Sequence, residues 1–177
     1  MKVFALAASV TAAFLLLVLA ATPNEANATA PRTKTTHLIF ENCNGGTTLK
    51  VTLPRLTFKA DQPVTFNVTI SNPSATPCGP SPPVVGLVQG SSRLEVGPCG
   101  PVSMVIDNAK KADVYPGHVA IGCPAEFGLL LPAQGSLTAT GTWDQKIPFG
   151  GSHKAPRGHY RLVIDNAVTF PITLTGG

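Results

Sequence analysis

The chain has 177 residues, an apolar share of 44% and a formal net charge of +4 at pH 7. This length predicts one domain with a hydrophobic core of its own. The basic residues are scattered and do not alternate with aromatic residues, which argues against a nucleic acid as partner.

The first 28 residues have the pattern of a secretory signal peptide. Lys2 precedes an uncharged run over 3–21, and small residues then end in Ala26-Asn27-Ala28. This pattern predicts cleavage after Ala28, secretion and no membrane attachment of the mature chain. The alternative is an uncleaved membrane anchor, since the apolar run approaches the roughly 20 residues that span a bilayer. Residues 29–36 are then expected to be a flexible mature N-terminus, and 37–177 the folded domain.

The first half of the mature chain predicts three strands. Residues 37–40 predict a short one, and 49–53 and 64–71 predict two more, because their apolar and polar residues alternate. The 64–71 strand contains the glycosylation sequon Asn67-Val68-Thr69, and alternation places Asn67 on its solvent face. Residues 72–83 hold five prolines, which lack the amide donor of a central strand, so a surface loop is expected there.

Four cysteines are expected to form two disulfides in a secreted chain: Cys43, Cys78, Cys99 and Cys123. Pro77-Cys78-Gly79-Pro80 recurs as Pro98-Cys99-Gly100-Pro101, and the residues over 84–96 between them predict a hairpin. We therefore expect Cys78 to pair with Cys99, and Cys43 with Cys123. A zinc site is the alternative, but neither a Cys-x-x-Cys nor a His-x-x-x-His spacing supports it.

The second half predicts further strands. Short apolar runs over 102–106, 114–121 and 127–131 are bounded by Gly, Pro or Asn, and 136–143, 160–164 and 168–174 alternate with a period of two. No long segment after the signal peptide has helical spacing. The fold class is therefore all-β, an immunoglobulin-like antiparallel β-sandwich, with a closed barrel as the alternative.

One short sequence occurs twice. Val105-Ile106-Asp107-Asn108-Ala109 recurs as Val163-Ile164-Asp165-Asn166-Ala167. Asp and Asn favour the left-handed conformations of tight turns, so two similar strand ends explain the repeat. A duplicated half-domain is the alternative.

Catalytic motifs are absent from the sequence. It has no Gly-x-Ser-x-Gly, no phosphate-binding Gly-x-x-x-x-Gly-Lys and no His-Glu-x-x-His. We expect no enzyme activity, no metal site and no cofactor. A small hydrolase or metal enzyme remains an alternative, because His118 and His159 could converge in space.

A loop after the strand over 136–143 is the candidate binding site for a protein partner. It puts apolar residues where polar ones are expected, and its candidate contact residues are Lys146, Ile147, Pro148, Phe149 and His153. Exposed apolar side chains on a loop between rigid strands commonly bind partners. The alternative is that Phe149 folds back over the end of the sandwich. The loop over 72–83 is a second candidate surface.

Three segments resemble the C-terminal part of BsuPI-type proteinase inhibitor domains. They are Leu131-Pro132-Ala133-Gln134-Gly135, Gly141-Thr142-Trp143-Asp144-Gln145 and Ala155-Pro156-Arg157-Gly158-His159-Tyr160. The resemblance is confined to the C-terminal third of the chain, and it implies an immunoglobulin-like sandwich. It also implies a second functional alternative, a proteinase inhibitor that presents an exposed loop to a protease. Alternation places Trp143 and Tyr160 in the core, so these motifs support the fold more directly than the inhibition.

Overall fold

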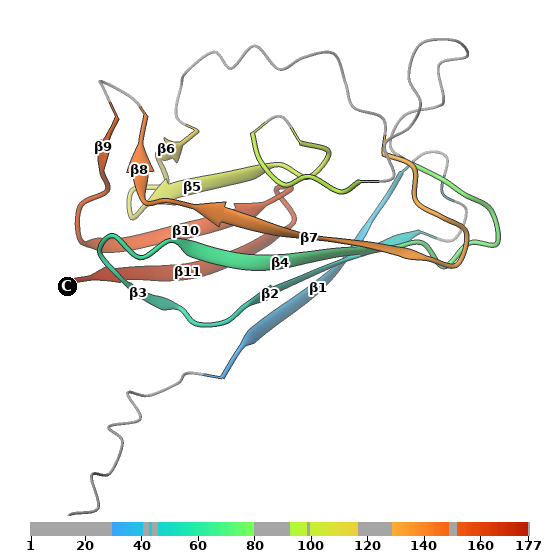
Figure 1. The fold of residues 1–177 in the computed structure, drawn as a ribbon, viewed down its shortest axis with the longest axis horizontal. Coiled ribbons are helices and arrows are strands. Elements are labelled where there is room, and N and C mark those ends of the chain that lie inside the picture. Colours follow the sequence, from blue (N-terminus) through green and yellow to red (C-terminus); the bar gives the residue numbers. More distant parts are fainter. Residues whose placement is uncertain are drawn as a thin grey trace, which may run out of the picture.

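Two β-sheets packed face to face make up most of the domain, and a third sheet of two strands accompanies them (Figure 1). The computed structural model describes residues 30–40, 43, 46–79, 93–98, 100–116, 129–148 and 152–176, and these residues form strands and no helix. The strands are β1 (Arg32–Leu38), β2 (Thr47–Leu53), β3 (Thr57–Lys59), β4 (Val64–Ser71), β5 (Met104–Asn108), β6 (Asp113–Tyr115), β7 (Ser136–Trp143), β8 (Lys146–Ile147), β9 (His153–Lys154), β10 (Gly158–Ile164) and β11 (Val168–Thr175).

The strand order identifies the type of sandwich. The first sheet has the order β1-β2-β4-β7, and the second has the order β3-β11-β10-β5-β6. Apart from the short β3, the chain passes from the first sheet to the second between β4 and β5, returns between β6 and β7, and passes to the second sheet again between β7 and β10, as in a Greek key. Strands β2-β4-β7 facing β11-β10-β5 are the arrangement of an immunoglobulin-like domain, so the predicted fold class is confirmed. The other named strands pair antiparallel, but β3 runs parallel to the end of β11.

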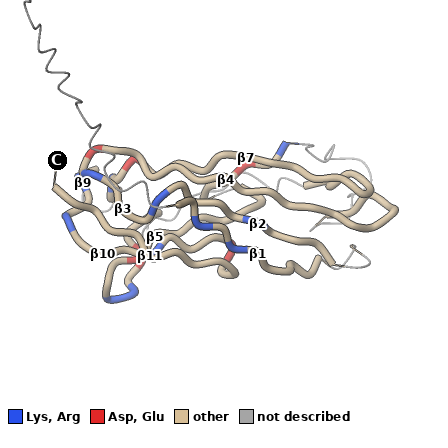
Figure 2. Tube along the Cα trace, turned by 90° about the horizontal axis from the view of Figure 1, so that it is seen from below, with Lys and Arg blue, Asp and Glu red and all other residues tan. Residues whose placement is uncertain are grey.

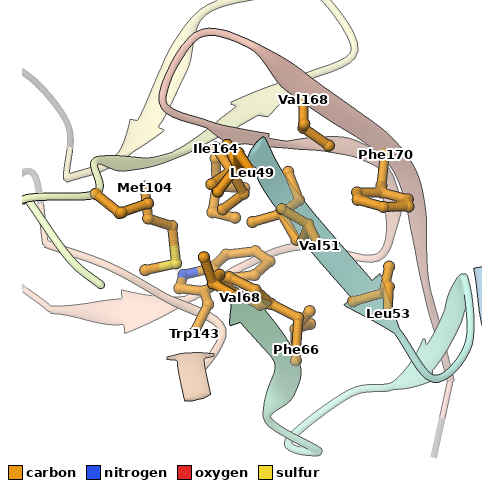
Figure 3. Close-up of a cluster of buried hydrophobic side chains, with 14 of the residues drawn as sticks. Leu49, Val51, Leu53, Phe66, Val68, Met104, Trp143, Ile164, Val168 and Phe170 are labelled. Atoms are coloured by element: carbon orange, nitrogen blue, oxygen red, sulfur yellow. The ribbon is translucent and has the colours of Figure 1, made fainter. Parts of the chain in front are cut away.

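The core lies between the sheets and takes one face of each long strand (Figure 3). Buried and less buried residues alternate along β2, β4 and β11, which confirms the strands predicted there from the period of two. The strands predicted over 136–143 and 160–164 are confirmed as well. Trp143 is fully buried, and the ring of Phe66 fills the space where a side chain at Gly141 would lie.

Strand β1 was not expected from the sequence over most of its length. Residues 32–36 were predicted to be part of a flexible N-terminus, but they pair with β2 along the whole strand. The prediction failed because β1 is an edge strand whose inward positions are mostly polar. Lys34 lies opposite the buried Val51, and its ammonium group donates to the carbonyl oxygen of Thr169 and lies 5.2 Å from the ring centre of Phe170.

The disulfide pairing predicted from the Pro-Cys-Gly-Pro repeat is wrong. Cys43 is bonded to Cys78, with 5.1 Å between their Cα atoms. The reason is the sheet register: Thr48 at the start of β2 pairs with Ser71 at the end of β4, so the segments before β2 and after β4 leave the sheet together. The bond ties the loop after β4 to the loop before β2. Cys99 and Cys123 lie outside the described residues.

The remaining strand predictions have mixed outcomes. The runs predicted at 102–106 and 114–121 correspond to β5 and β6, although residues 117–128 lie outside the described part. The hairpin predicted over 84–96 lies outside it up to residue 92, and Val96 forms an isolated bridge with Val102 instead of a strand. Leu131, at the end of the run predicted over 127–131, forms an isolated bridge with Cys78.

The two copies of the repeated segment end at different turns. Asp165 and Asn166 both have a φ of 52° and form the turn between β10 and β11. Such left-handed residues are typical of tight β-hairpin turns. The side chain of Asn108 instead accepts hydrogen bonds from the backbone of Lys110 and Ala112 in the turn after β5.

Candidate binding surface

The connection from β7 to β10 crosses one end of the sandwich and is held by two aromatic side chains. The indole nitrogen of Trp143 donates to the carbonyl oxygen of Lys146 at 3.0 Å, and the hydroxyl of Tyr160 donates to that of Pro156 at 2.7 Å. Their rings lie 5.6 Å apart. A tyrosine near the start of this strand that bonds to the backbone a few residues upstream is the tyrosine corner of immunoglobulin-like domains.

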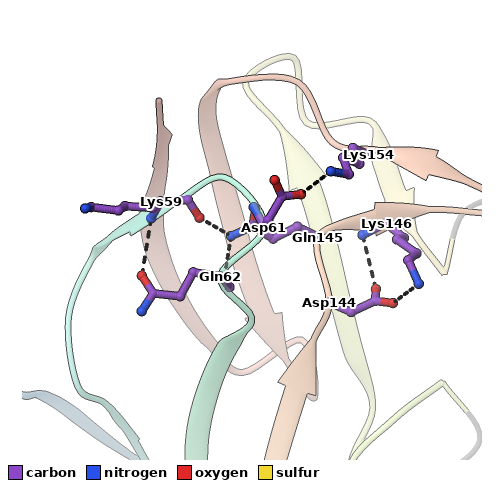
Figure 4. A network of polar contacts seen from close by, with 7 residues as sticks. All are labelled: Lys59, Asp61, Gln62, Asp144, Gln145, Lys146 and Lys154. Atoms are coloured by element: carbon purple, nitrogen blue, oxygen red, sulfur yellow. Dashed lines mark hydrogen bonds and ion pairs between the residues drawn. The ribbon is translucent and has the colours of Figure 1, made fainter. Parts of the chain in front are cut away.

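Gln145 fixes the start of this connection (Figure 4). Its side chain is almost fully buried and its backbone has a φ of 61°. The amide nitrogen donates to the carbonyl oxygens of Lys59 and Gln62, and the amide oxygen accepts from the backbone N–H of Asp61 at 3.1 Å. Because all these partners belong to the turn between β3 and β4, one side chain joins the two segments that meet at this end.

Strands β8 and β9 form a short hairpin above that base. Lys146 pairs with Lys154 and Ile147 with His153 in the ladder, and Ala155 N–H donates to Gln145 O at 2.7 Å. Ion pairs join the hairpin to its surroundings, from Lys154 to Asp61 at 2.6 Å and from Lys146 to Asp144 at 3.1 Å (Figure 4). All four side chains are largely exposed, so these ion pairs orient the hairpin more than they stabilise it.

The candidate contact residues are placed differently from one another. Lys146, Pro148 and His153 are exposed on the hairpin. Ile147 is half-buried and packs against the core, so it belongs to the base of the hairpin. Phe149 lies outside the described residues.

The second candidate surface is held from inside by Asn72. This buried side chain donates to the carbonyl oxygens of Thr76 and Pro132 and accepts from the N–H of Ser74. Together with the Cys43–Cys78 bond, these contacts fix residues 72–79 against the neighbouring loop. Residues 80–83 lie outside the described part.

Of the two histidines considered for catalysis, the structure describes His159. His159 is exposed and lies 3.1 Å from the hydroxyl of Thr173, and His118 lies outside the described residues. Asp107 forms an ion pair with Arg161 at 3.4 Å, across the paired strands β5 and β10. In the described part of the chain, no three His, Cys, Asp or Glu side chains gather as a metal site would require.

Among the described residues, three groups have pKa values shifted from their usual ones. Burial raises the pKa of the Asp165 carboxyl, although hydrogen bonds with Ser103 act in the opposite direction. Burial also raises the pKa of Tyr160, and burial followed by the charge of Asp144 raises that of Tyr115. Both phenols therefore stay protonated at neutral pH, which suits Tyr160 as a hydrogen-bond donor.

Charge is spread over the described trace with both signs present (Figure 2). Lys and Arg positions are spread along the described trace, in keeping with the scattered basic residues of the sequence. A search of the described residues for a helix long and apolar enough to cross a bilayer found none.

Comparison with known proteins gives little further information. No family model matches the chain, and no curated protein matches it. A solved structure that it resembles is a beta-glucosidase from Listeria innocua in complex with gluconolactone, with a TM-score of 0.39 and 10% sequence identity. The match covers 83% of this chain and 16% of that one. A likeness this weak carries no argument about activity.

Proposed function

We propose that the chain is a secreted, non-catalytic, immunoglobulin-like domain that binds a protein partner through the β8–β9 hairpin. The observation that carries the proposal is the fixed base of this hairpin. Gln145 joins it to the β3–β4 turn, while Pro148 and His153 remain exposed. A projecting segment on a rigid base loses little conformational freedom on binding, which favours affinity.

A second candidate function is inhibition of a proteinase by the same hairpin. The resemblance of the Trp-Asp-Gln and Pro-x-Gly-x-Tyr segments to BsuPI-type domains favours it. These residues form the base, through Trp143, Gln145 and Tyr160, and they leave the hairpin tip as the segment that a protease cleft would receive.

The binding proposal is tested by capture from the native extracellular fluid with immobilised residues 29–177. A hairpin variant, Pro148→Asp with His153→Ala, is compared with Lys50→Glu, which changes an exposed residue of β2. We expect one captured protein that the Lys50 variant retains and the hairpin variant loses. Equal capture by both variants would place the contact elsewhere.

The inhibitor proposal needs its own assay. The purified domain is incubated at micromolar concentration with serine, cysteine, aspartic and metalloproteases, and substrate hydrolysis is followed. Slowing of one class by the wild type and by the Lys50 variant, but not by the hairpin variant, would support inhibition. Undiminished hydrolysis by every protease would exclude it and leave the binding proposal standing.

A further inference from the structure

The outer face of the first sheet is rich in hydroxyl groups and poor in charge. Its rows follow the strand register: Thr33, Thr52, Asn67 and Thr140 form one row, and Thr35, Lys50, Thr69 and Thr138 form the next. Hydroxyl pairs at 3.0 Å join Thr33 to Thr52 and Thr69 to Thr138. In the described part of the chain, Lys50 and His37 are the titratable residues of this face.

Asn67 lies near the centre of this face. It belongs to β4, which has β2 on one side and β7 on the other, and its side chain is exposed while Phe66 and Val68 point into the core. The amide oxygen of Asn67 accepts a hydrogen bond from the hydroxyl of Thr140 at 3.0 Å. Within the described residues its amide nitrogen has no acceptor. The amide is thus held by its oxygen and presents its nitrogen to solvent.

A shallow depression lies beside this amide. Its volume is about 250 Å³, and its lining includes Pro31, Pro54, Thr52, Thr65 and Thr140 in addition to Asn67 itself. The hydroxyl groups can hydrogen-bond to a sugar, and the proline rings can pack against it. The position therefore has both an accessible nitrogen and room for a first sugar residue.

The other asparagines in the described residues lack this combination. Asn72 is buried with both amide atoms engaged, and proline follows it. Asn108 and Asn166 are followed two positions later by Lys110 and Val168, so neither begins an Asn-x-Ser/Thr sequence. Asn67-Val68-Thr69 does, and this is the sequence that N-glycosylation requires.

We infer that Asn67 is the acceptor of an N-linked glycan when the chain is secreted. The donor is a lipid-pyrophosphate-linked oligosaccharide, and the catalyst is an oligosaccharyltransferase. The amide nitrogen forms a bond to C1 of the first sugar and loses a proton, while the bond from that carbon to the pyrophosphate oxygen breaks and the lipid pyrophosphate leaves. The inference rests on the proposed secretion. It adds that the outer face of the first sheet is covered by glycan, which leaves the hairpin end open.

The test is expression of the full chain in cells that carry out N-glycosylation, followed by treatment with a peptide amidase that removes N-glycans. We expect a mobility shift on treatment and conversion of Asn67 to Asp in the peptide mass spectrum. Asn67→Gln and Thr69→Ala should abolish the shift, and Thr69→Ser should retain it. Because Thr69→Ser keeps the hydroxyl, it separates loss of the acceptor sequence from loss of folding.

A second arm replaces residues 1–28 with a cleaved leader of the host, so that failure of secretion is distinguished from failure of glycosylation. Secreted protein without an amidase-sensitive shift would overturn the inference, and so would a shift that survives Asn67→Gln. Capture through the hairpin should be the same for glycosylated protein and for Asn67→Gln, since the sheet face and the hairpin are separate surfaces.

Discussion

The hydroxyl of Tyr160 donates a 2.7 Å hydrogen bond to the carbonyl oxygen of Pro156, so a side chain near the start of β10 also fixes the segment leading into this strand. Removing this hydroxyl leaves the Pro156 carbonyl without its partner. We expect Tyr160→Phe to lower the free energy of unfolding by about 1–2 kcal/mol, measured by urea denaturation. Tyr115→Phe is the control, because Tyr115 donates no hydrogen bond to the described residues. Equal losses of unfolding free energy in Tyr160→Phe and Tyr115→Phe would contradict a specific role for the hydrogen bond from Tyr160 to Pro156.

Gln145 is the second test of this end of the domain. Gln145→Ala removes three hydrogen bonds at a buried site and should cost at least about 2 kcal/mol of unfolding free energy. Gln145→Glu keeps the shape but sets a carboxylate against the carbonyl oxygens of Lys59 and Gln62. We therefore expect it to destabilise the domain at pH 7 and to recover partly at pH 4, relative to wild type at each pH. A Glu variant as stable as wild type at pH 7 would rule out this network.

Asp165 should make stability depend on pH. Its folded-state pKa is raised by burial, so the folded state holds its proton more tightly than the unfolded state. The contribution of this group to stability is therefore fully present below the unfolded pKa and is lost as the pH rises through the folded pKa. Asp165→Asn keeps a residue that tolerates the left-handed turn, and should be more stable than wild type at neutral pH. Urea denaturation from pH 3 to pH 7 should show this advantage shrinking toward the acid end. A difference in unfolding free energy between Asp165→Asn and wild type that stays constant over this pH range would contradict the raised pKa of Asp165.

Lys34 should protect the edge of the first sheet. An inward-pointing charge on an edge strand discourages pairing with another chain. Lys34→Ile should therefore self-associate with increasing concentration in sedimentation velocity experiments. Lys50→Ile, with the same change of charge on the outer face, should remain monomeric over that range. Identical sedimentation of the Lys34→Ile and Lys50→Ile variants would contradict a protective role for Lys34.

The Cys43–Cys78 bond gives a prediction for the other two cysteines. Once this pair is formed, Cys123 is the partner left within the chain for Cys99. We expect non-reducing peptide mapping to find both bonds and no free thiol in the secreted protein. Cys43→Ser with Cys78→Ser should lower stability by about 3–4 kcal/mol, because the bond closes a segment with a sequence separation of 35. A map linking Cys78 to Cys99 would contradict the structure.

Much of the sandwich could be predicted because its central strands are half-buried. The period of two in β4 and β7 reports burial directly, since a strand with one face in the core alternates apolar and polar residues. Strand β1 carries no such signal, because its hydrogen bonds are made by the backbone and Arg32 and Lys34 occupy inward positions. The disulfide pairing could be derived only from the register of β2 against β4. The repeated Pro-Cys-Gly-Pro sequence around Cys78 and Cys99 carries no information about that register.

The arrangement of the residues proposed for binding could not be predicted from the sequence. Its residues were expected in one irregular loop, whereas Lys146 and Ile147 pair with His153 and Lys154 as a hairpin. Gln145 was recognised only as part of a resemblance. Its role depends on the β3–β4 turn, which lies more than 80 residues away in the chain, and β3 has only three residues.

The residues at the base of the β8–β9 hairpin are required by the fold, whereas the sequence of the hairpin tip can change. In the described part of the chain, the side-chain hydrogen bonds of Trp143, Gln145 and Tyr160 go to Lys146, to the β3–β4 turn and to Pro156, and none of them goes to Pro148 or Ser152. Insertions or exchanged sequences between Pro148 and Ser152 should therefore leave the domain folded. The domain could acquire new partners by changes in tip length alone, and for the same reason it offers a position for grafting foreign recognition loops.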